Sequence, residues 1–259
     1  MSRKGSLLRI KEKIMAKLWA DFYDCFIDAK TYLLYLEGLR NTVFIALIAC
    51  AIGFVIGVVV TAVRIAPKTN LFVRVADAVA RVYVTVIRGT PVVLQLFIGY
   101  FVIFATMKFS GLLGISNTDG IPVAGLVFGI NSGAYMSEIL RGGINSVDYG
   151  QTEAGRSLGL SWSKTFVKIV LPQAFKSTIP TIFNEFITLL KETSVAGYVG
   201  IYELTKVRED ITTANMQLYM PLFIIAAMYL ILVLLLQQLQ KLIERRLTKG
   251  DKQRYLRFD

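Results

Sequence analysis

Residues 41–63 form a run of 23 residues without a charged side chain, and no other feature of this sequence constrains its fold as much. A helix needs about 20 apolar residues to cross the hydrocarbon core of a bilayer. Further charge-free runs cover residues 89–107, 120–137 and 211–240. Because hydrocarbon offers the backbone no hydrogen-bonding partner, runs of this length predict membrane-spanning helices.

A weaker apolar stretch lies between residues 172 and 200, where four charged residues interrupt it. These are Lys176, Glu185, Lys191 and Glu192. A charged residue is tolerated in a membrane helix that faces the bundle interior or an aqueous cavity, so we count this stretch as a fifth span. The sequence therefore predicts an all-α integral membrane protein with about five transmembrane helices, near residues 39–65, 89–108, 120–142, 172–198 and 214–244.

The composition agrees with a membrane protein and excludes several kinds of catalysis. Charged residues make up only 18% of the 259 residues, where a soluble domain has about a quarter. Histidine is absent, which excludes His-based catalytic triads, His-ligated zinc and imidazole proton relays. Cys25 and Cys50 have no metal-ligand spacing. We therefore expect no catalytic residue, no metal site and no cofactor bound by this chain.

The distribution of Lys and Arg predicts an orientation, because cytoplasmic loops carry an excess of both. Residues 64–88 carry five basic side chains against one acidic, and residues 241–259 carry seven basic side chains. Both segments are expected in the cytoplasm, and five spans then place the N-terminus outside. Residues 1–40 fit an outside tail poorly, because they carry eight basic side chains against five acidic ones.

The same reasoning divides the chain into three parts. Residues 1–37 form an N-terminal tail, whose mixture of apolar, aromatic and charged residues is compatible with an amphipathic helix on the membrane surface. Residues 38–240 form the transmembrane domain, and residues 241–259 form a basic cytoplasmic tail.

The segment between the third and fourth spans predicts two short helices. Asp148 can cap the first, with Gln151 three residues later as in a capping box. Gly159 supplies the break, because glycine enters the left-handed conformation without steric cost. Ser161 can cap the second helix, and Pro172 can open the next span. On local chemistry alone, this segment is a plain connector between two spans.

A sequence motif within this segment gives it a more specific interpretation. It resembles the EAA loop of binding-protein-dependent ABC importer permeases, whose pattern is E-A-A, three residues, G, nine residues, then I-x-L-P. Six positions are in register: Glu153, Ala154, Gly159, Ile169, Leu171 and Pro172. The departure is Gly155, where the second alanine usually stands.

The resemblance implies an ABC type-1 transmembrane domain whose cytoplasmic loop docks into a cleft on a separate ATPase subunit. The small residues Ala154 and Gly155 would let that partner approach closely, and Glu153 and Arg156 would offer charges on one helix face. The chain has no Gly-x4-Gly-Lys-Ser/Thr phosphate loop, so ATP and magnesium are expected on the partner ATPase.

Other stretches resemble the polar amino-acid branch of these permeases, the histidine/glutamine type, and together they cover about residues 38–246. The stretches are Arg88–Pro91, Asn131–Tyr135, Glu138–Ile144, Asn184–Ile187 and Leu190–Ser194. Within them the candidates for the substrate pathway are Asn131, Glu138, Glu185, Glu192 and Ser194.

Each candidate also has a structural interpretation. Asn131 and its small neighbours are equally suited to close helix packing. Glu138 is three residues from Arg141, which favours an ion pair over substrate contact. Glu185 and Glu192 are seven apart and share one helix face, and a structural or gating role for them stays open. Arg88 is interpreted as a positive anchor at a cytoplasmic helix start.

The leading hypothesis is therefore a multi-pass permease subunit of an ABC importer in the bacterial cytoplasmic membrane, which moves polar amino acids by alternating access. The expected partners are two ATPase subunits, a second permease that is identical or related, and an extracytoplasmic amino-acid-binding protein, with no nucleic acid. The alternatives are an ion-driven secondary transporter or channel subunit, for which the sequence shows no internal repeat, and an intramembrane enzyme.

Overall fold

The computed structural model describes residues 3–103 and 120–255, with side chains over 9–103 and 120–246, and in this part the chain is helical without strands. Its elements are α1 (Arg3–Phe22), η1 (Tyr23–Ile27), η2 (Asp28–Lys30), α2 (Tyr32–Ile65), α3 (Leu71–Gly89), α4 (Val92–Ile98), η3 (Gly99–Ile103), α5 (Ile121–Asn145), α6 (Tyr149–Ser157), α7 (Trp162–Thr165), η6 (Phe166–Val170), α8 (Leu171–Glu192), η7 (Thr193–Val199), α9 (Leu204–Asn215) and α10 (Tyr219–Tyr255).

Within the described residues, three helices are long and apolar enough to cross a membrane: α2, α5 and residues Tyr219–Arg246 of α10. A fourth crossing is added if α3 and the α4–η3 segment, which meet at an angle of 107°, cross as one bent unit. The predicted fifth span is the 22-residue helix α8, whose four charged residues make it less apolar than the others. The all-α membrane fold is confirmed.

One boundary prediction was wrong. The sequence predicts a connecting segment over residues 64–88 and a second span from residue 89, but residues Leu71–Gly89 form helix α3. Asn70 caps its start by accepting a hydrogen bond from the Val73 amide at 2.9 Å. The break comes at Thr90 and Pro91, because proline disfavours helical geometry in the residue before it. Residues 104–108 of the predicted span lie outside the described part.

Helices α2 and α5 form the centre of the bundle and pack closely through glycine. Gly125, Gly129 and Gly133 of α5 lie against Ile48, Ile52 and Ile56 of α2, and a Cβ atom at any of the three would come within 2.8 Å of its isoleucine. Spacings of four residues on both helices place each set on one face. These contacts support the packing interpretation of the small residues beside Asn131, and the seam extends beyond that segment to Gly125 and Gly129.

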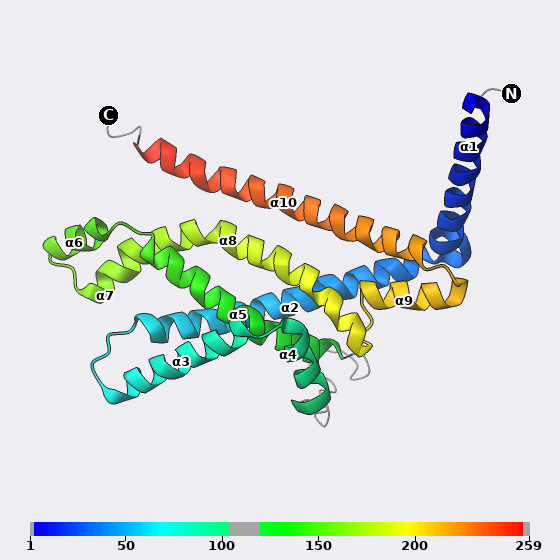
Figure 1. Ribbon diagram of the computed structural model, residues 1–259. Coiled ribbons are helices and arrows are strands. Elements are labelled where there is room, and N and C mark those ends of the chain that lie inside the picture. The colour runs from blue at the N-terminus through cyan, green and yellow to red at the C-terminus, as the bar shows by residue number, and fades with distance from the viewer. Residues whose placement is uncertain (1–2, 104–119, 256–259) are drawn as a thin grey trace.

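The same contacts fix the helix directions. Both residue series rise together along the seam, so α2 and α5 run parallel. Helix α8 runs antiparallel to α5, because Gly143 meets Thr178 whereas Ser132, nearer the start of α5, meets Glu185. Figure 1 shows the consequence: α6, α7 and the C-terminal end of α10 lie at one end of the bundle, and α1 and α9 lie at the other.

The N-terminal segment contains the helix α1, which projects away from the bundle in Figure 1. Its apolar side chains Ile10, Ile14 and Trp19 are more than half exposed. Helix α2 begins at Tyr32, before the predicted start of the first span at residue 39. The location of α1 on a membrane surface stays a prediction, as does the division at residues 37 and 240.

Candidate functional site

A helical hairpin, made of α6 and α7, stands at one end of the bundle between α5 and α8 (Figure 1). Both predicted caps are present, since Asp148 accepts a hydrogen bond from the Gly150 amide at 2.7 Å and Ser161 accepts one from the Lys164 amide at 3.4 Å. The predicted capping box is not formed, because the Asp148 side chain bonds the Gly150 amide and the Gln151 side-chain oxygen accepts from Gln173 of α8. Gly159 separates the two helices with φ of +81°, the left-handed conformation expected for it. Pro172 lies in the first turn of α8, as predicted. The local chemistry of this segment therefore determines its fold.

Gly155 has a different role from the one expected of it. The sequence analysis assigned it to a surface that a partner approaches, but Gly155 is buried and faces the interior of the hairpin. A Cβ atom there would lie 2.7 Å from Thr165 Cγ2 and 2.9 Å from Ile169 Cδ1. Glycine in place of the usual alanine thus lets α6 pack against its neighbouring helix. The predicted role of Gly155 in partner contact was wrong.

The outer surface of the hairpin carries the remaining motif residues. Glu153 and Ala154 are exposed on α6, and Leu158 at the tip is 81% exposed. Arg156 is partly engaged within the hairpin, because its guanidinium donates to the Leu160 carbonyl at 2.8 Å. Ile169 contacts Gly155, whereas Leu171 is exposed at the start of α8. A charged and an apolar group are therefore available on one accessible surface.

A polar cluster lies between α4, α5 and α8. Ser132 donates a hydrogen bond to Glu185 at 2.9 Å, and Asn131 donates one to Gln95 at 2.9 Å. Asn131 and Ser132 are buried, and Glu185 is half-buried. The two predicted pathway residues are therefore held by separate contacts, Asn131 by Gln95 of α4 and Glu185 by Ser132 of α5. Because Ser132, next to Asn131, packs against Gly53 of α2, the packing interpretation of this segment gains support, and a pathway role for Asn131 stays a prediction.

Sequence reasoning missed Gln95. Its amide nitrogen donates to the carbonyls of Ile87 and Thr90, at 2.8 and 3.1 Å, which the break before Pro91 leaves without helical partners. Its amide oxygen accepts from Asn131. A single polar amide in the apolar run 89–107 was the available signal, because a buried amide in a membrane helix needs a partner.

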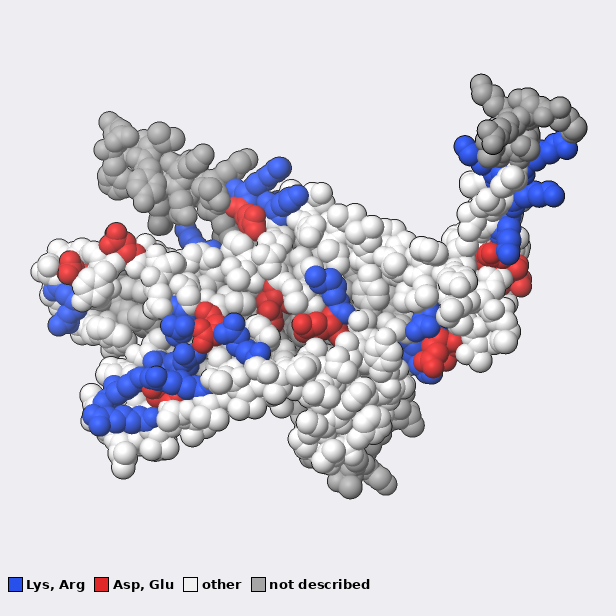
Figure 2. Space-filling view, viewed as in Figure 1, with Lys and Arg blue, Asp and Glu red and all other residues white. Residues whose placement is uncertain are grey.

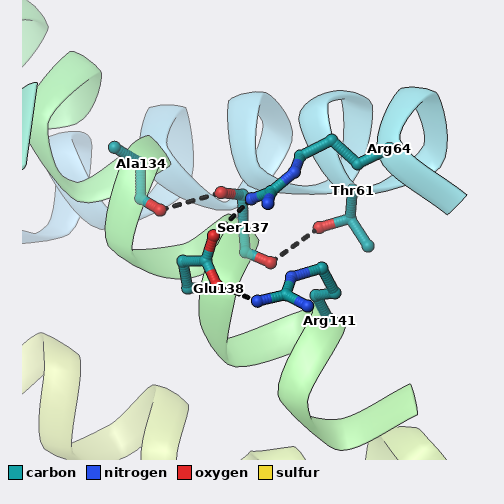
Figure 3. Close-up of polar contacts among 6 residues, drawn as sticks. All are labelled: Thr61, Arg64, Ala134, Ser137, Glu138 and Arg141. Carbon is teal, nitrogen blue, oxygen red and sulfur yellow. Dashed lines mark hydrogen bonds and ion pairs between the residues drawn. The ribbon is translucent and has the colours of Figure 1, made fainter. Parts of the chain in front are cut away.

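Glu138 lies in a separate charge cluster near the hairpin end of α5, shown in Figure 3. The expected ion pair with Arg141 is present at 2.6 Å, and Glu138 also pairs with Arg64 of α2. Thr61 of α2 donates to the Ser137 carbonyl at 3.0 Å, so uncharged polar groups join the two helices one turn away. The Arg64 contact was not foreseen, because it joins residues 74 positions apart.

The remaining candidates lie towards the opposite end of α8. Glu192 is the last residue of that helix, and Ser194 follows in η7; both are half-buried. The prediction that Arg88 stands at a helix start was wrong, because it lies in the last turn of α3, where its guanidinium is over the Tyr135 ring at 5.2 Å from the centroid. A cation held against an aromatic face is stabilised by the ring quadrupole.

A second missed group is Glu203, which is fully buried at the start of α9. Its carboxylate accepts from the amides of Thr205 and Lys206, at 2.8 and 3.1 Å, and from the Tyr229 hydroxyl of α10 at 3.1 Å. Thr42 of α2 also donates to it, at 3.4 Å. Burial raises the pKa of Glu203 from its ordinary 4.5 to about 7, and these hydrogen bonds only partly oppose the shift.

The described residues contain no group of three or more Cys, Asp or Glu side chains placed to hold a metal ion. What they do contain is a helical membrane bundle with a polar cluster between its helices and a capped hairpin at one end. This arrangement defines the class of the protein as a polytopic membrane permease. The chain belongs to the family described as "Binding-protein-dependent transport system inner membrane component", which matches residues 53–249.

Curated relatives agree with this family. The chain is 38% identical over 216 residues to the arginine transport system permease protein ArtQ of Bacillus subtilis (strain 168), covering 83% of this chain and 93% of that protein. It is 36% identical to the L-cystine transport system permease protein TcyB of the same organism, covering 82% and 86%. It is 35% identical to the glutamine transport system permease protein GlnP of Escherichia coli (strain K12), covering 83% and 93%.

Solved structures share the fold. A structure described as "Crystal structure of an amino acid ABC transporter with histidines" matches with a TM-score of 0.74 and 32% identity, covering 84% of this chain and 95% of that one. An inward-facing structure of the MetNI methionine ABC transporter matches with a TM-score of 0.65 at 17% identity, covering 85% and 99%, and supports the fold alone. The chain therefore belongs to the binding-protein-dependent permease family and shares the fold of ABC transporter permeases.

Proposed function

We propose that this chain forms the transmembrane pathway of an ATP-driven importer, and that it moves polar amino acids across the cytoplasmic membrane by alternating access. The relatives named above transport arginine, cystine and glutamine, which supports polar amino acids as the substrate class. The observation that carries the proposal is the direct connection between the hairpin and the polar cluster.

That connection is helical throughout. Helix α7, η6 and α8 follow one another without a loop from Trp162 to Glu192, a length of roughly 45 Å at 1.5 Å per residue. Gln151 of α6 accepts a hydrogen bond from Gln173 of α8 at 3.4 Å, which ties the other hairpin helix to the same element. A force applied to the exposed hairpin therefore reaches Glu185 through continuous secondary structure.

In this proposal an ATPase subunit binds the exposed side of the hairpin around Glu153, Ala154 and Leu158. ATP and magnesium bind to two such subunits and close them, and the paired hairpins move together. A second permease, identical or related, completes the pathway, and an extracytoplasmic binding protein delivers the amino acid at the α9 end. Because the work is conformational, the residues of this chain orient substrate and transmit movement.

The proposed orientation places the hairpin and the end of α10 in the cytoplasm. Lys and Arg side chains gather over the α3 end of the bundle near the hairpin, and the surface over α4 is uncharged (Figure 2). An excess of basic side chains is typical of the cytoplasmic side. The basic side chains of α1 at the opposite end are an exception to this rule.

The substrate would pass the polar cluster of Gln95, Asn131, Ser132 and Glu185, and then Glu192 at the end of α8 and Ser194 in η7. Carboxylates at these positions suit the ammonium group that every amino acid carries, and a second cationic group on arginine or lysine. Glu138 is assigned a structural role, because two arginines already share its charge.

Reconstitution tests the proposal. The permease, its candidate ATPase and its binding protein are placed in proteoliposomes, and uptake of labelled arginine, glutamine and cystine is followed. We expect uptake that requires ATP inside and binding protein outside and that survives ionophores. Uptake that is driven by an ion gradient without ATP would instead identify a secondary transporter.

A further inference from the structure

A cavity of about 610 Å³ lies between the hairpin and the ends of α2 and α5. Its charged wall is formed by Arg64 and Arg141, and its apolar wall includes Ile65 and Val147. The hairpin contributes Trp162 and Phe166, whose rings stack with centroids 5.3 Å apart and planes 6° from parallel. The cavity is thus amphipathic, with two cations on one side and apolar and aromatic surface on the other.

The charges of this cavity are unbalanced. Arg64 and Arg141 both pair with the single carboxylate of Glu138, which leaves one positive charge in excess in this cluster (Figure 3). The Nε atom of Arg141 is buried and has no hydrogen-bond partner. The geometry favours an anion with several acceptor oxygens, because guanidinium groups bind phosphate through more than one N–H.

The position of the cavity indicates which kind of molecule would carry that anion. It adjoins Ile65 and Asn145, the last residues of the parallel helices α2 and α5. Helices that cross a bilayer end at the level of the lipid headgroups. The apolar wall then suits the glycerol and the first carbons of an acyl chain, which inorganic phosphate lacks.

We propose that this cavity binds an anionic phospholipid, with its phosphate against Arg64 and Arg141 and its glycerol end against Ile65, Val147 and the Trp162–Phe166 pair. The assignment to the cytoplasmic leaflet rests on the proposed function. Bound there, the lipid links the hairpin to the ends of α2 and α5 and makes the seating of the hairpin sensitive to membrane charge.

Tryptophan fluorescence tests this site, because Trp162 lines it and the sequence contains only one other tryptophan, Trp19. The full-length permease with Trp19→Phe is kept in detergent micelles that contain a small fraction of brominated lipid, which quenches nearby tryptophan. We expect brominated phosphatidylglycerol to quench Trp162 at lower mole fraction than brominated phosphatidylcholine. Arg141→Gln should weaken the apparent affinity for the anionic lipid about five-fold, the effect of removing one basic residue near an anionic headgroup.

Two further variants separate the site from general effects. Lys164→Gln removes the same charge from an exposed position of α7 outside the cavity and should leave the quenching unchanged. Val147→Phe fills the cavity without removing either arginine and should reduce quenching by the anionic lipid, which keeps the test valid even where Arg141→Gln does not fold.

Three outcomes would overturn the proposal. The first is equal quenching by the two lipids, and the second is an equal loss in Lys164→Gln and Arg141→Gln. The third is displacement of the lipid by millimolar inorganic phosphate, which would identify a site for small anions. Because the measurement needs neither ATPase nor substrate, its failure would leave the proposed transport function untouched, and failed transport would leave the lipid site standing.

Discussion

The two ends of the bundle are built differently. At the hairpin end, the caps of α6 and α7 are formed by side chains two or three residues from the amides they bind, and Glu153 and Ala154 are exposed. At the α9 end, Glu203 is fully buried and joins α9 to α2 and α10, through residues 161 and 26 positions away. The hairpin itself is held by local contacts and presents its surface, with the long-range pair of Arg64 and Glu138 beside it in α2 and α5, whereas α9 is joined to α2 and α10 by contacts across the chain.

This difference has a mechanical meaning for a permease. Exposed elements held by local contacts can move as units without disrupting the core. The α9 end resists such movement, because its contacts tie three helices together in a buried site. Movement that starts at the hairpin therefore acts against a fixed opposite end, and the α2–α5 seam lies between the two.

The largest expected effect comes from the fastened end and depends on pH. The carboxyl of Glu203 is protonated below about pH 4.5 whether the chain is folded or unfolded. Between pH 4.5 and the raised pKa of about 7, only the unfolded chain ionises, so the stability of the folded protein falls. The total loss is about 3 kcal/mol and is complete above that range. Thermal unfolding of the purified protein from pH 5 to 8 would measure it.

The matching variants are Glu203→Gln, which should lose this pH dependence, and Glu209→Gln, which removes an exposed carboxylate of the same helix and should keep it. A Glu203→Gln protein with the pH profile of the parent would show that this carboxyl does not control the α9 end.

The next prediction concerns the glycine seam, where α5 packs against α2 between the two ends. Gly129→Ala places a Cβ 2.7 Å from Ile52 Cβ, and such overpacking costs about 2 kcal/mol. Gly142→Ala in the same helix has nothing within 4 Å of the added atom and should be neutral or slightly stabilising. Comparing the thermal unfolding of the two variants isolates the packing effect, and equal midpoints would mean that the seam is loose.

A third prediction concerns substrate at the far end of α8. If Glu192 binds the cationic side chain of arginine, Glu192→Gln should lower arginine uptake about tenfold, the value of one charge-assisted hydrogen bond. Assembly and basal ATPase activity should persist, and glutamine uptake serves as the internal control. Loss of assembly would support a structural role for Glu192, and unchanged uptake of arginine would exclude the contact.

The smallest effect on stability is expected at the exposed end. Gly159→Val forces a β-branched residue into the left-handed conformation, at a cost of about 1 kcal/mol or more. We expect the spans to stay folded and ATP hydrolysis to become uncoupled from substrate. Gly159→Asn is the control, because asparagine tolerates that conformation. A Gly159→Val complex with normally stimulated ATPase would contradict the role of the hairpin.

The comparison of the two ends also explains what the sequence could reveal. The caps at Asp148 and Ser161 and the break at Gly159 were predictable, because each depends on residues a few positions apart. The role of Gly155 was not, because its small size serves Thr165 and Ile169 and not a partner. The contacts of Arg64 and Glu203 join residues far apart in the chain, and one sequence contains no record of such pairings.

The prediction of residues 64–88 as a connecting segment was wrong for a related reason. Its charges, which include Asp77 between Lys68 and Arg81, gave residues 64–88 the composition of a loop. In the structure Asp77 forms ion pairs with both cations, at 2.5 and 2.6 Å, so the one acidic residue of α3 is neutralised by Arg81 of the same helix and by Lys68 just before it. Pairing of this kind cannot be read from a count of basic residues.

The local construction of the hairpin makes it an exchangeable unit. The hairpin is defined by contacts within residues 148–172, namely its caps, its glycine break and the contact of Gly155 with Ile169. Most of the interactions that fold this stretch are therefore internal to it. If an ATPase binds the hairpin as proposed, exchange of about two dozen consecutive residues would change the ATPase that is recognised and would leave the long-range contacts around Glu203 and along the glycine seam as they are. The residues proposed to contact the substrate and those proposed to contact the ATPase could then change independently of each other in evolution.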